Sequence, residues 1–161
     1  MRNKSFTKSR IIFAMLTVAV MVCIFLFSCE NAEKSSDTSG FFVNIITNMF
    51  SKKLSKLSYA EQSVFLDNIS HIVRKTAHFT IYAALGFFNS LTIGQRHIIG
   101  SGSFGVIGFC FLYACSDELH QYFIPERACM FSDVVLDTCG GLAGMLISFI
   151  FLRNSKNHNV T

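Results

Sequence analysis

The sequence is poor in charged residues, which excludes an ordinary soluble domain. Only 15% of its 161 residues are charged, whereas 51% are hydrophobic. Soluble domains carry about 25% charged residues. A soluble chain of this length would form one domain, but this composition favours a division of the chain into membrane spans.

The sequence also lacks the patterns of nucleic-acid and nucleotide binding. Its net charge is only +4, and no run of Lys or Arg is placed on a soluble helix or sheet, so nucleic acid is not an expected partner. Residues Gly100–Gly105 match the GxGxxG pattern, but they follow no strand and open an apolar run, so no nucleotide is expected either. We expect these small residues, like Gly140 and Gly144 in GxxxG spacing, to let membrane helices pack closely.

Cysteine pairs with metal-site spacing are also missing. The six cysteines form no CxxC pair and no zinc-finger spacing. Only Cys29 and Cys129 fall in predicted loops. A disulfide between them is the alternative to two free thiols, and we expect the free thiols. Proline occurs once, and Pro125 is expected to break a helix and start a turn.

Four apolar runs predict transmembrane helices, because about 20 apolar residues span the hydrocarbon core of a bilayer. They are Ile11–Ser28, Ala77–Ile93, Ile98–Ser116 and Asp133–Leu152. A cleaved signal peptide is the alternative for the first run, since Leu26–Cys29 resembles a lipoprotein cleavage box. Phe27 fits that box poorly and the run is long for a signal peptide, so we expect an uncleaved helix.

A polar loop and amphipathic segments separate the first two runs. Residues 30–40 are polar and Ser-rich, which predicts a loop. Residues 41–57 carry an apolar stripe beside three lysines, which is typical of a helix lying in the membrane interface. Ser58–Glu61 has a capping-box pattern, so a new helix is expected to begin there. The chain is thereby divided into residues 1–28, 29–73, 74–152 and 153–161.

Basic residues favour one orientation of these spans. Arg2, Lys4, Lys8 and Arg10 precede the first run, and the first helix usually dominates membrane topology. We therefore expect both termini in the cytoplasm. The predicted fold is all-α: a polytopic membrane protein with four transmembrane helices and an interfacial amphipathic helix.

Polar side chains gather at the outer end of the last three predicted spans. Arg74, His78 and Tyr82 follow at i, i+4 and i+8, so they share one helix face. Because ionisable groups inside a membrane are costly, they are functional candidates by default. Ten residues converge at this end: Arg74, Lys75, His78, Tyr82, Asp117, Glu118, Gln121, Arg127, Asp133 and Asp137. The first helix is expected to contribute nothing to this polar cluster.

Three segments of the cluster resemble the signatures of the VanZ-like membrane proteins. They are Arg74–Gly86 (RKTAHFTIYAALG), Asp117–Arg127 (DELHQYFIPER) and Asp133–Gly140 (DVVLDTCG). Asp137 stands where the family often has Asn. The resemblance implies a multi-pass protein of the bacterial plasma membrane and cell envelope. The family is named for a protein associated with resistance to the glycopeptide teicoplanin, which implies a process and no reaction, so whether the chain is an enzyme stays open.

The first functional hypothesis is a site for an anionic envelope lipid or a lipid-linked cell-wall precursor. Its candidate binding residues are Arg74, Lys75, Tyr82, Gln121, Arg127, Asp133 and Asp137. Arginine suits bidentate contact with a phosphate or carboxylate. His78 and Glu118 are candidates for an acid–base pair, with Asp117 as a further catalytic candidate.

Two other hypotheses use the same residues. His78 and the four acidic residues of the cluster could supply nitrogen and oxygen ligands to a metal, but the sequence has no HExxH or HxxxH, so we expect neither metal nor cofactor. Alternatively, the basic side chains pair with the acidic ones and lock the bundle, which is how membrane interiors tolerate charge. The chain would then be a non-catalytic structural or interaction protein.

Overall fold

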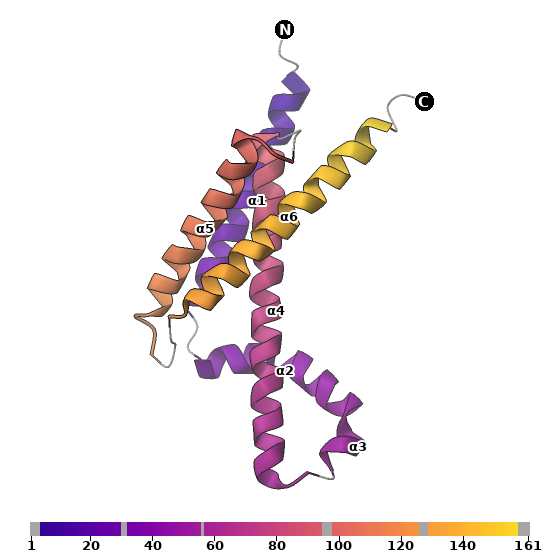
Figure 1. Cartoon of the computed structure of the whole chain (residues 1–161), viewed down its shortest axis with the longest axis vertical. Coiled ribbons are helices and arrows are strands. Elements are labelled where there is room, and N and C mark those ends of the chain that lie inside the picture. Colours follow the sequence, from indigo (N-terminus) through magenta and orange to yellow (C-terminus); the bar gives the residue numbers. More distant parts are fainter. Residues whose placement is uncertain (1–3, 30–31, 56, 95–97, 126–128, 158–161) are drawn as a thin grey trace.

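The computed structural model describes residues 4–29, 32–55, 57–94, 98–125 and 129–157. All regular secondary structure in these residues is helical, which confirms the all-α prediction. The helices are α1 (Lys4–Ser28), α2 (Ala32–Met49), α3 (Ser51–Leu54), α4 (Tyr59–Ile93), α5 (Ser101–Gln121) and α6 (Phe131–Asn157) (Figure 1). Helix α5 ends before Pro125, as the position of that proline predicts.

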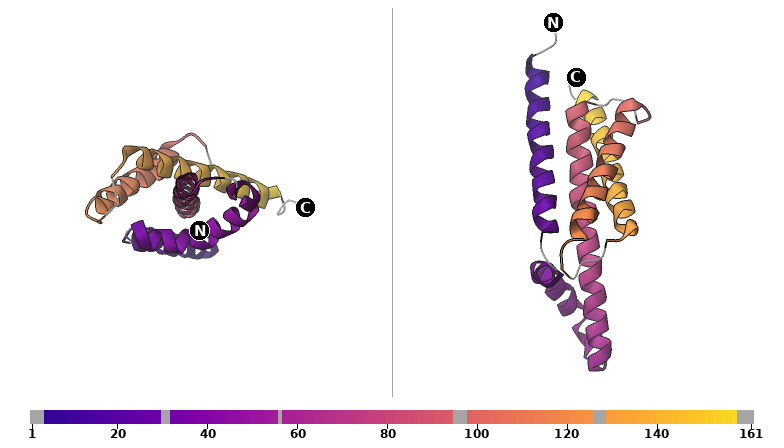
Figure 2. Two further views of the ribbon diagram at one scale, coloured as in Figure 1. Left: turned by 90° about the horizontal axis from the view of Figure 1, so that it is seen from below. Right: turned by 90° about the vertical axis from the view of Figure 1, so that its left-hand side faces the viewer.

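Four helices form a bundle and two lie below it. Helices α1, α4, α5 and α6 run alongside one another, while α2 lies across the lower end of the bundle (Figures 1 and 2). Helix α4 has 35 residues, which corresponds to a length of about 52 Å. It therefore extends well below the other three helices and carries α2 and α3 beside its first half.

The start of α4 is the predicted capping box. The Ser58 side chain accepts a hydrogen bond from the Glu61 backbone N–H, and the Glu61 carboxylate accepts one from the Ser58 N–H at 2.8 Å. The sequence had suggested an amphipathic helix followed by a separate span at Ala77. The structure instead has one uninterrupted helix, because neither glycine nor proline separates the two parts.

The predicted loop over residues 30–40 is wrong for most of its length, because α2 begins at Ala32. Serine is common in this segment but costs a helix only a few tenths of a kcal/mol per residue. No proline stops the helix before Met49. Phe41 and Phe42, on the apolar stripe of α2, are exposed. That exposure suits a helix on a membrane surface, and the interfacial position stays a prediction.

Two described helices are long and apolar enough to cross a membrane. They are the segments Lys8–Ser28 in α1 and Phe131–Arg153 in α6. The predicted span Ala77–Ile93 lies within α4, and the predicted span Ile98–Ser116 lies in α5 from Ser101 onward. Both helices run beside these two segments. The count of four transmembrane helices therefore stays a prediction.

Glycines bring α4 and α6 into backbone contact. A Cβ atom at Gly140 would collide with the backbone of Phe79, and one at Gly144 would collide with the backbone of Ala83. A Cβ at Gly86 would in turn meet the backbone of Gly141. The predicted close packing at Gly140 and Gly144 is thus confirmed.

The same expectation is wrong at Gly105, in the GxGxxG segment. A Cβ added there would meet nothing within 4 Å among the described residues. Gly105 lies on the exposed face of α5, whereas the neighbouring Ser103 and Val106 are buried, so Gly105 makes no close helix contact among the described residues. The sequence could not show this, because the pattern of small residues does not reveal which face of a helix is covered.

Helix α1 is held against the bundle along its length. Near its start, Arg10 donates hydrogen bonds to the carbonyl oxygens of Thr92 and Ile93 at the end of α4. Near its other end, the Tyr113 hydroxyl on α5 donates to the carbonyl of Met21 at 2.7 Å. The beginning of α1 and the end of α6 lie at the same end of the bundle (Figure 1).

The glycine contact predicts a sharp difference between two alanine substitutions. We expect Gly144→Ala to lower the free energy of unfolding by about 1–3 kcal/mol, because the new methyl group forces α4 and α6 apart. Gly105→Ala is the matched control. It adds the same methyl group to open space and should be neutral or stabilise by up to about 1 kcal/mol. Unfolding of the detergent-solubilised protein measures both. Equal effects of the two substitutions would contradict the assigned packing.

Candidate functional site

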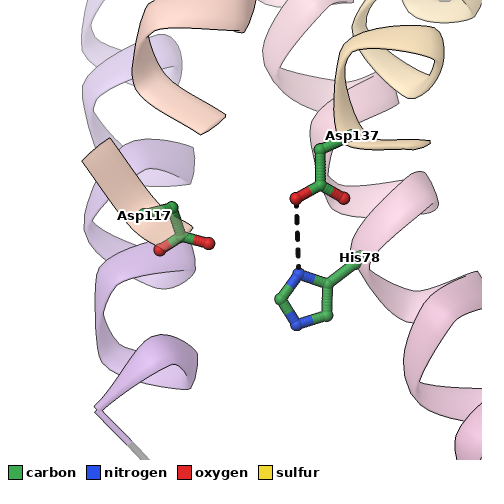
Figure 3. Close-up of side chains that lie close together, drawn as sticks. All are labelled: His78, Asp117 and Asp137. Atoms are coloured by element: carbon green, nitrogen blue, oxygen red, sulfur yellow. Dashed lines mark ion pairs between the residues drawn. The ribbon is translucent and has the colours of Figure 1, made fainter. Parts of the chain in front are cut away.

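Three ionisable side chains meet inside the lower end of the bundle. His78 comes from α4, Asp117 from α5 and Asp137 from α6 (Figure 3). The His78 Nδ1 atom lies 3.7 Å from the Asp137 Oδ2 atom. One nitrogen or oxygen atom from each residue lies within 4.8 Å of the others. Both aspartates are buried, with 5% exposure for Asp117 and 1% for Asp137.

Asp117 is held by hydrogen bonds from two helices. The Ser28 hydroxyl at the end of α1 donates to its Oδ1 atom. The Gln121 amide, one turn further along α5, donates to its Oδ2 atom at 3.1 Å and to the Ser28 hydroxyl at 3.0 Å. The shared face of Asp117 and Gln121 follows from the continuation of α5 beyond the apolar run.

The participation of Ser28 corrects the prediction that the first helix contributes nothing to the polar cluster. Ser28 is completely buried and bonds to the central carboxylate. Its position at the end of an apolar run was visible in the sequence. No spacing rule, however, connects it to Asp117, which lies 89 residues away. Only the packing of α1 against α5 brings the two together.

Two buried groups beside this network have no hydrogen-bond partner among the described residues. Both carboxylate oxygens of Asp137 lack a hydrogen-bond partner among the described residues, and so does the hydroxyl of Tyr82. Tyr82 is fully buried, one helical turn beyond His78 on the same face of α4. A buried polar group without a partner costs roughly 1–3 kcal/mol. The site is therefore built at the expense of stability.

A second group of charges surrounds the buried one. Lys75 on α4 forms an ion pair with Asp133 at the start of α6. The Glu118 carboxylate accepts a hydrogen bond from the Met130 backbone N–H at 2.9 Å. No described hydrogen bond or ion pair joins His78 to Glu118, and the acidic neighbour of His78 is Asp137. The acid–base pair suggested by the sequence thus does not form a direct contact among the described residues.

Burial shifts the ionisation of the acids that lie beyond Ser116, where the third predicted span ends. It raises the pKa of Glu118, and the hydrogen bond from Met130 only partly opposes this shift. Burial also raises the pKa of Asp117, against the lowering effect of its bond from Ser28. On the other side of the cluster, burial lowers the pKa of Lys75. Each of these groups is thus more easily neutralised than in water.

Arg74 occupies the outer part of the cluster. It lies one turn before His78 on α4 and is half-buried. Its Nε atom is buried and has no hydrogen-bond partner among the described residues. Arg127, the third basic residue of the predicted site, lies outside the described residues. The described structure thus contains nine of the ten predicted residues, all of them at one end of the bundle.

These features define an all-helical protein with a buried polar site at one end of its bundle and with two helices long and apolar enough to cross a membrane. The sequence matches the VanZ/LLP1 family over residues 13–152, and the chain belongs to that family. The resemblance seen in the three motifs is confirmed, and the match also takes in most of α1. No curated protein and no solved structure matches the chain.

The raised pKa of Glu118 predicts a pH dependence of stability. Between the ordinary carboxyl value of 4.5 and the raised pKa, the folded chain keeps a proton that the unfolded chain has lost. The free energy of unfolding therefore falls as the pH rises from that value through the raised pKa. We expect Glu118→Gln to reduce this fall, because its amide oxygen can still accept the Met130 hydrogen bond. Urea or detergent unfolding between about pH 4 and pH 8 measures the effect.

Glu61→Gln is the control for this experiment. Glu61 is exposed, and its bonds to Ser58 lower its pKa, so its removal cannot reduce a fall in stability with rising pH. An unchanged pH profile for Glu118→Gln would show that this carboxyl group ionises normally in the folded protein.

Proposed function

We propose that this chain is a multi-pass protein of the bacterial plasma membrane, with four spans and both termini in the cytoplasm. Membership of the VanZ/LLP1 family and the two apolar helices support its membrane character. The predicted spans in α4 and α5 lie in the same bundle as these two helices. Four antiparallel crossings also return the chain to the side of the membrane where it started. The start of α1 and the end of α6 lie at the same end of the bundle, which agrees with this number of crossings.

We further propose that the polar site faces the outer leaflet and binds an anionic group of an envelope lipid or a lipid-linked cell-wall precursor. The unpartnered Nε atom of Arg74 carries this proposal. A half-buried guanidinium with a free donor is prepared for a phosphate or carboxylate, which it can bind through two parallel hydrogen bonds. Lys75, the next residue, adds positive charge beside it.

A role in glycopeptide tolerance follows from the same proposal. Teicoplanin acts on the cell envelope, and the family takes its name from a resistance-associated protein. A membrane protein that holds a cell-wall precursor or a surrounding lipid would alter the surface that the antibiotic meets. A chemical change of the bound ligand would require proton transfer by the buried residues. His78 and Asp137, which lie in contact, are the candidates for this step.

Binding of an anionic lipid predicts a selective effect of Arg74. Purified protein in phosphatidylcholine nanodiscs is mixed with phosphatidylglycerol or with a polyprenyl-diphosphate-linked precursor, and bound lipid is measured by native mass spectrometry. We expect Arg74→Gln to weaken binding of at least one of them by about tenfold or more, which corresponds to about 1.4 kcal/mol. His78→Ala and Glu118→Gln, tested in parallel, report on turnover of bound lipid.

Arg153→Gln is the matched control, because Arg153 is exposed near the opposite end of the bundle. It should leave lipid binding unchanged. Equal losses for Arg74→Gln and Arg153→Gln would mean that the lipids respond to overall charge. No binding of either lipid by the wild type would refute the proposed ligand class.

The alternative is a structural role for the charged motifs. Its support is that both described ion pairs, Lys75 with Asp133 and His78 with Asp137, connect α4 to α6. In that case the chain would be a non-catalytic structural or interaction protein. The pair at Lys75 is about one quarter exposed on each side, so its contribution to stability is expected to be about 1 kcal/mol or less.

A charge exchange separates the two roles. We expect Lys75→Asp alone to destabilise the fold, because it places two carboxylates together, and we expect Lys75→Asp with Asp133→Lys to restore stability. If the site binds an anion, the double variant should still bind lipid more weakly than the wild type, because the positive charge has moved to α6. Restoration of both stability and lipid binding would support the structural alternative.

A further inference from the structure

The carboxylate of Asp137 is the least expected feature of the buried site. It is 1% exposed, and neither of its oxygens has a hydrogen-bond partner among the described residues. A second carboxylate, Asp117, lies in the same small space. Two buried acids side by side require a compensating positive charge or a shared proton. His78, when protonated, supplies only one positive charge for the two.

We propose that His78, Asp117 and Asp137 form a binding site for a divalent transition-metal ion. One imidazole nitrogen and two carboxylate oxygens form a ligand set that suits Zn²⁺, Mn²⁺ or Fe²⁺. The charge of such an ion balances the two aspartates. This inference replaces the expectation of no metal, which rested on the absence of HExxH and HxxxH. Those motifs place ligands on one helix, whereas here three helices contribute one ligand each.

The distances between the ligand atoms are close to those of a filled site. Nitrogen and oxygen ligands lie about 2.0–2.2 Å from a zinc ion, so two of them on opposite sides are at most roughly 4.4 Å apart. The candidate atoms lie within 4.8 Å of one another, with 3.7 Å between His78 and Asp137. Small side-chain rotations therefore suffice to bring all three atoms to an ion, and Figure 3 shows the side chains pointing into one space.

The neighbours of Asp117 hold it in the orientation that an ion needs. Ser28 and Gln121 each donate a hydrogen bond to one of its oxygens. Each carboxylate oxygen has two lone pairs, so these bonds leave acceptor positions for a cation. Hydrogen bonds of this kind orient metal ligands in known sites and strengthen binding.

Tyr82 is a second, independent indication of a ligand at this place. Its hydroxyl is buried and has no hydrogen-bond partner among the described residues, and Tyr82 lies one helical turn beyond His78 on the same face of α4. Three protein ligands leave at least one coordination position for a water molecule or a substrate oxygen. A buried hydroxyl without a described partner, one helical turn from the ligand His78, is suited to donate a hydrogen bond to the group that fills this position.

Metal content of the full chain tests this site without any lipid, so its result is separate from that of the lipid experiment. The protein is purified without a histidine tag, treated with chelator, loaded with Zn²⁺ or Mn²⁺ and desalted. We expect about one ion per wild-type chain by mass spectrometry of the elements. Asp137→Asn and His78→Ala should each weaken binding by more than about 100-fold, and Ser28→Ala by about 10–100-fold.

Asp67→Asn and His71→Ala are matched controls, because both residues are exposed on the first half of α4. They should retain the ion. If the site variants fail to fold, the wild type alone decides: its melting temperature should rise with Zn²⁺ or Mn²⁺ and fall again with chelator. The proposal is overturned if the wild type retains neither ion and shows no such shift, or if Asp137→Asn binds as well as the wild type.

Discussion

The close contact between the backbones of α4 and α6 is the constraint on which the rest of the structure depends. Gly140 lies against the backbone of Phe79, and both residues are close in sequence to members of the polar site. His78 immediately precedes Phe79, and Asp137 lies three residues before Gly140. Once the two helices meet at these glycines, the imidazole and the carboxylate must face each other. The packing residues and the chemical residues are therefore parts of one motif.

The other two helices complete this arrangement in different ways. Helix α5 brings Asp117 to the pair, and α1 supplies Ser28 to hold Asp117 in place. Burying these groups removes them from water, which is costly unless hydrogen bonds or opposite charges replace the lost hydration. Asp117 receives such bonds, whereas Asp137 does not. Stability alone would favour an apolar residue at position 137, so the carboxylate there is more easily explained by ligand binding than by folding.

The extent to which the sequence predicted this structure differs between local and tertiary features. The capping box at Ser58 and the GxxxG contact depend on neighbours within one helix or on residue size, and both were correct. The continuity of α4 and the early start of α2 were missed, because weak helix propensities leave such boundaries undecided. Ser28 was missed for another reason. A serine at the end of an apolar run has many roles, and only the position of α1 beside α5 selects one.

The polar site contains two kinds of unpartnered group, and they differ in sign. At its outer side, Arg74 has a free donor. At its inner side, the carboxylate oxygens of Asp137 accept no described hydrogen bond, and Oδ2 has only the longer contact with His78 at 3.7 Å. No described hydrogen bond or ion pair joins the two groups, so they do not satisfy each other. Arg74 can therefore hold an anion while Asp137 holds a metal ion. The metal ion would also attract the anion that Arg74 holds. This order of charges, with the donor nearer the end of the bundle and the acceptor deeper inside, suits the binding of a phosphate or carboxylate between Arg74 and the proposed metal ion.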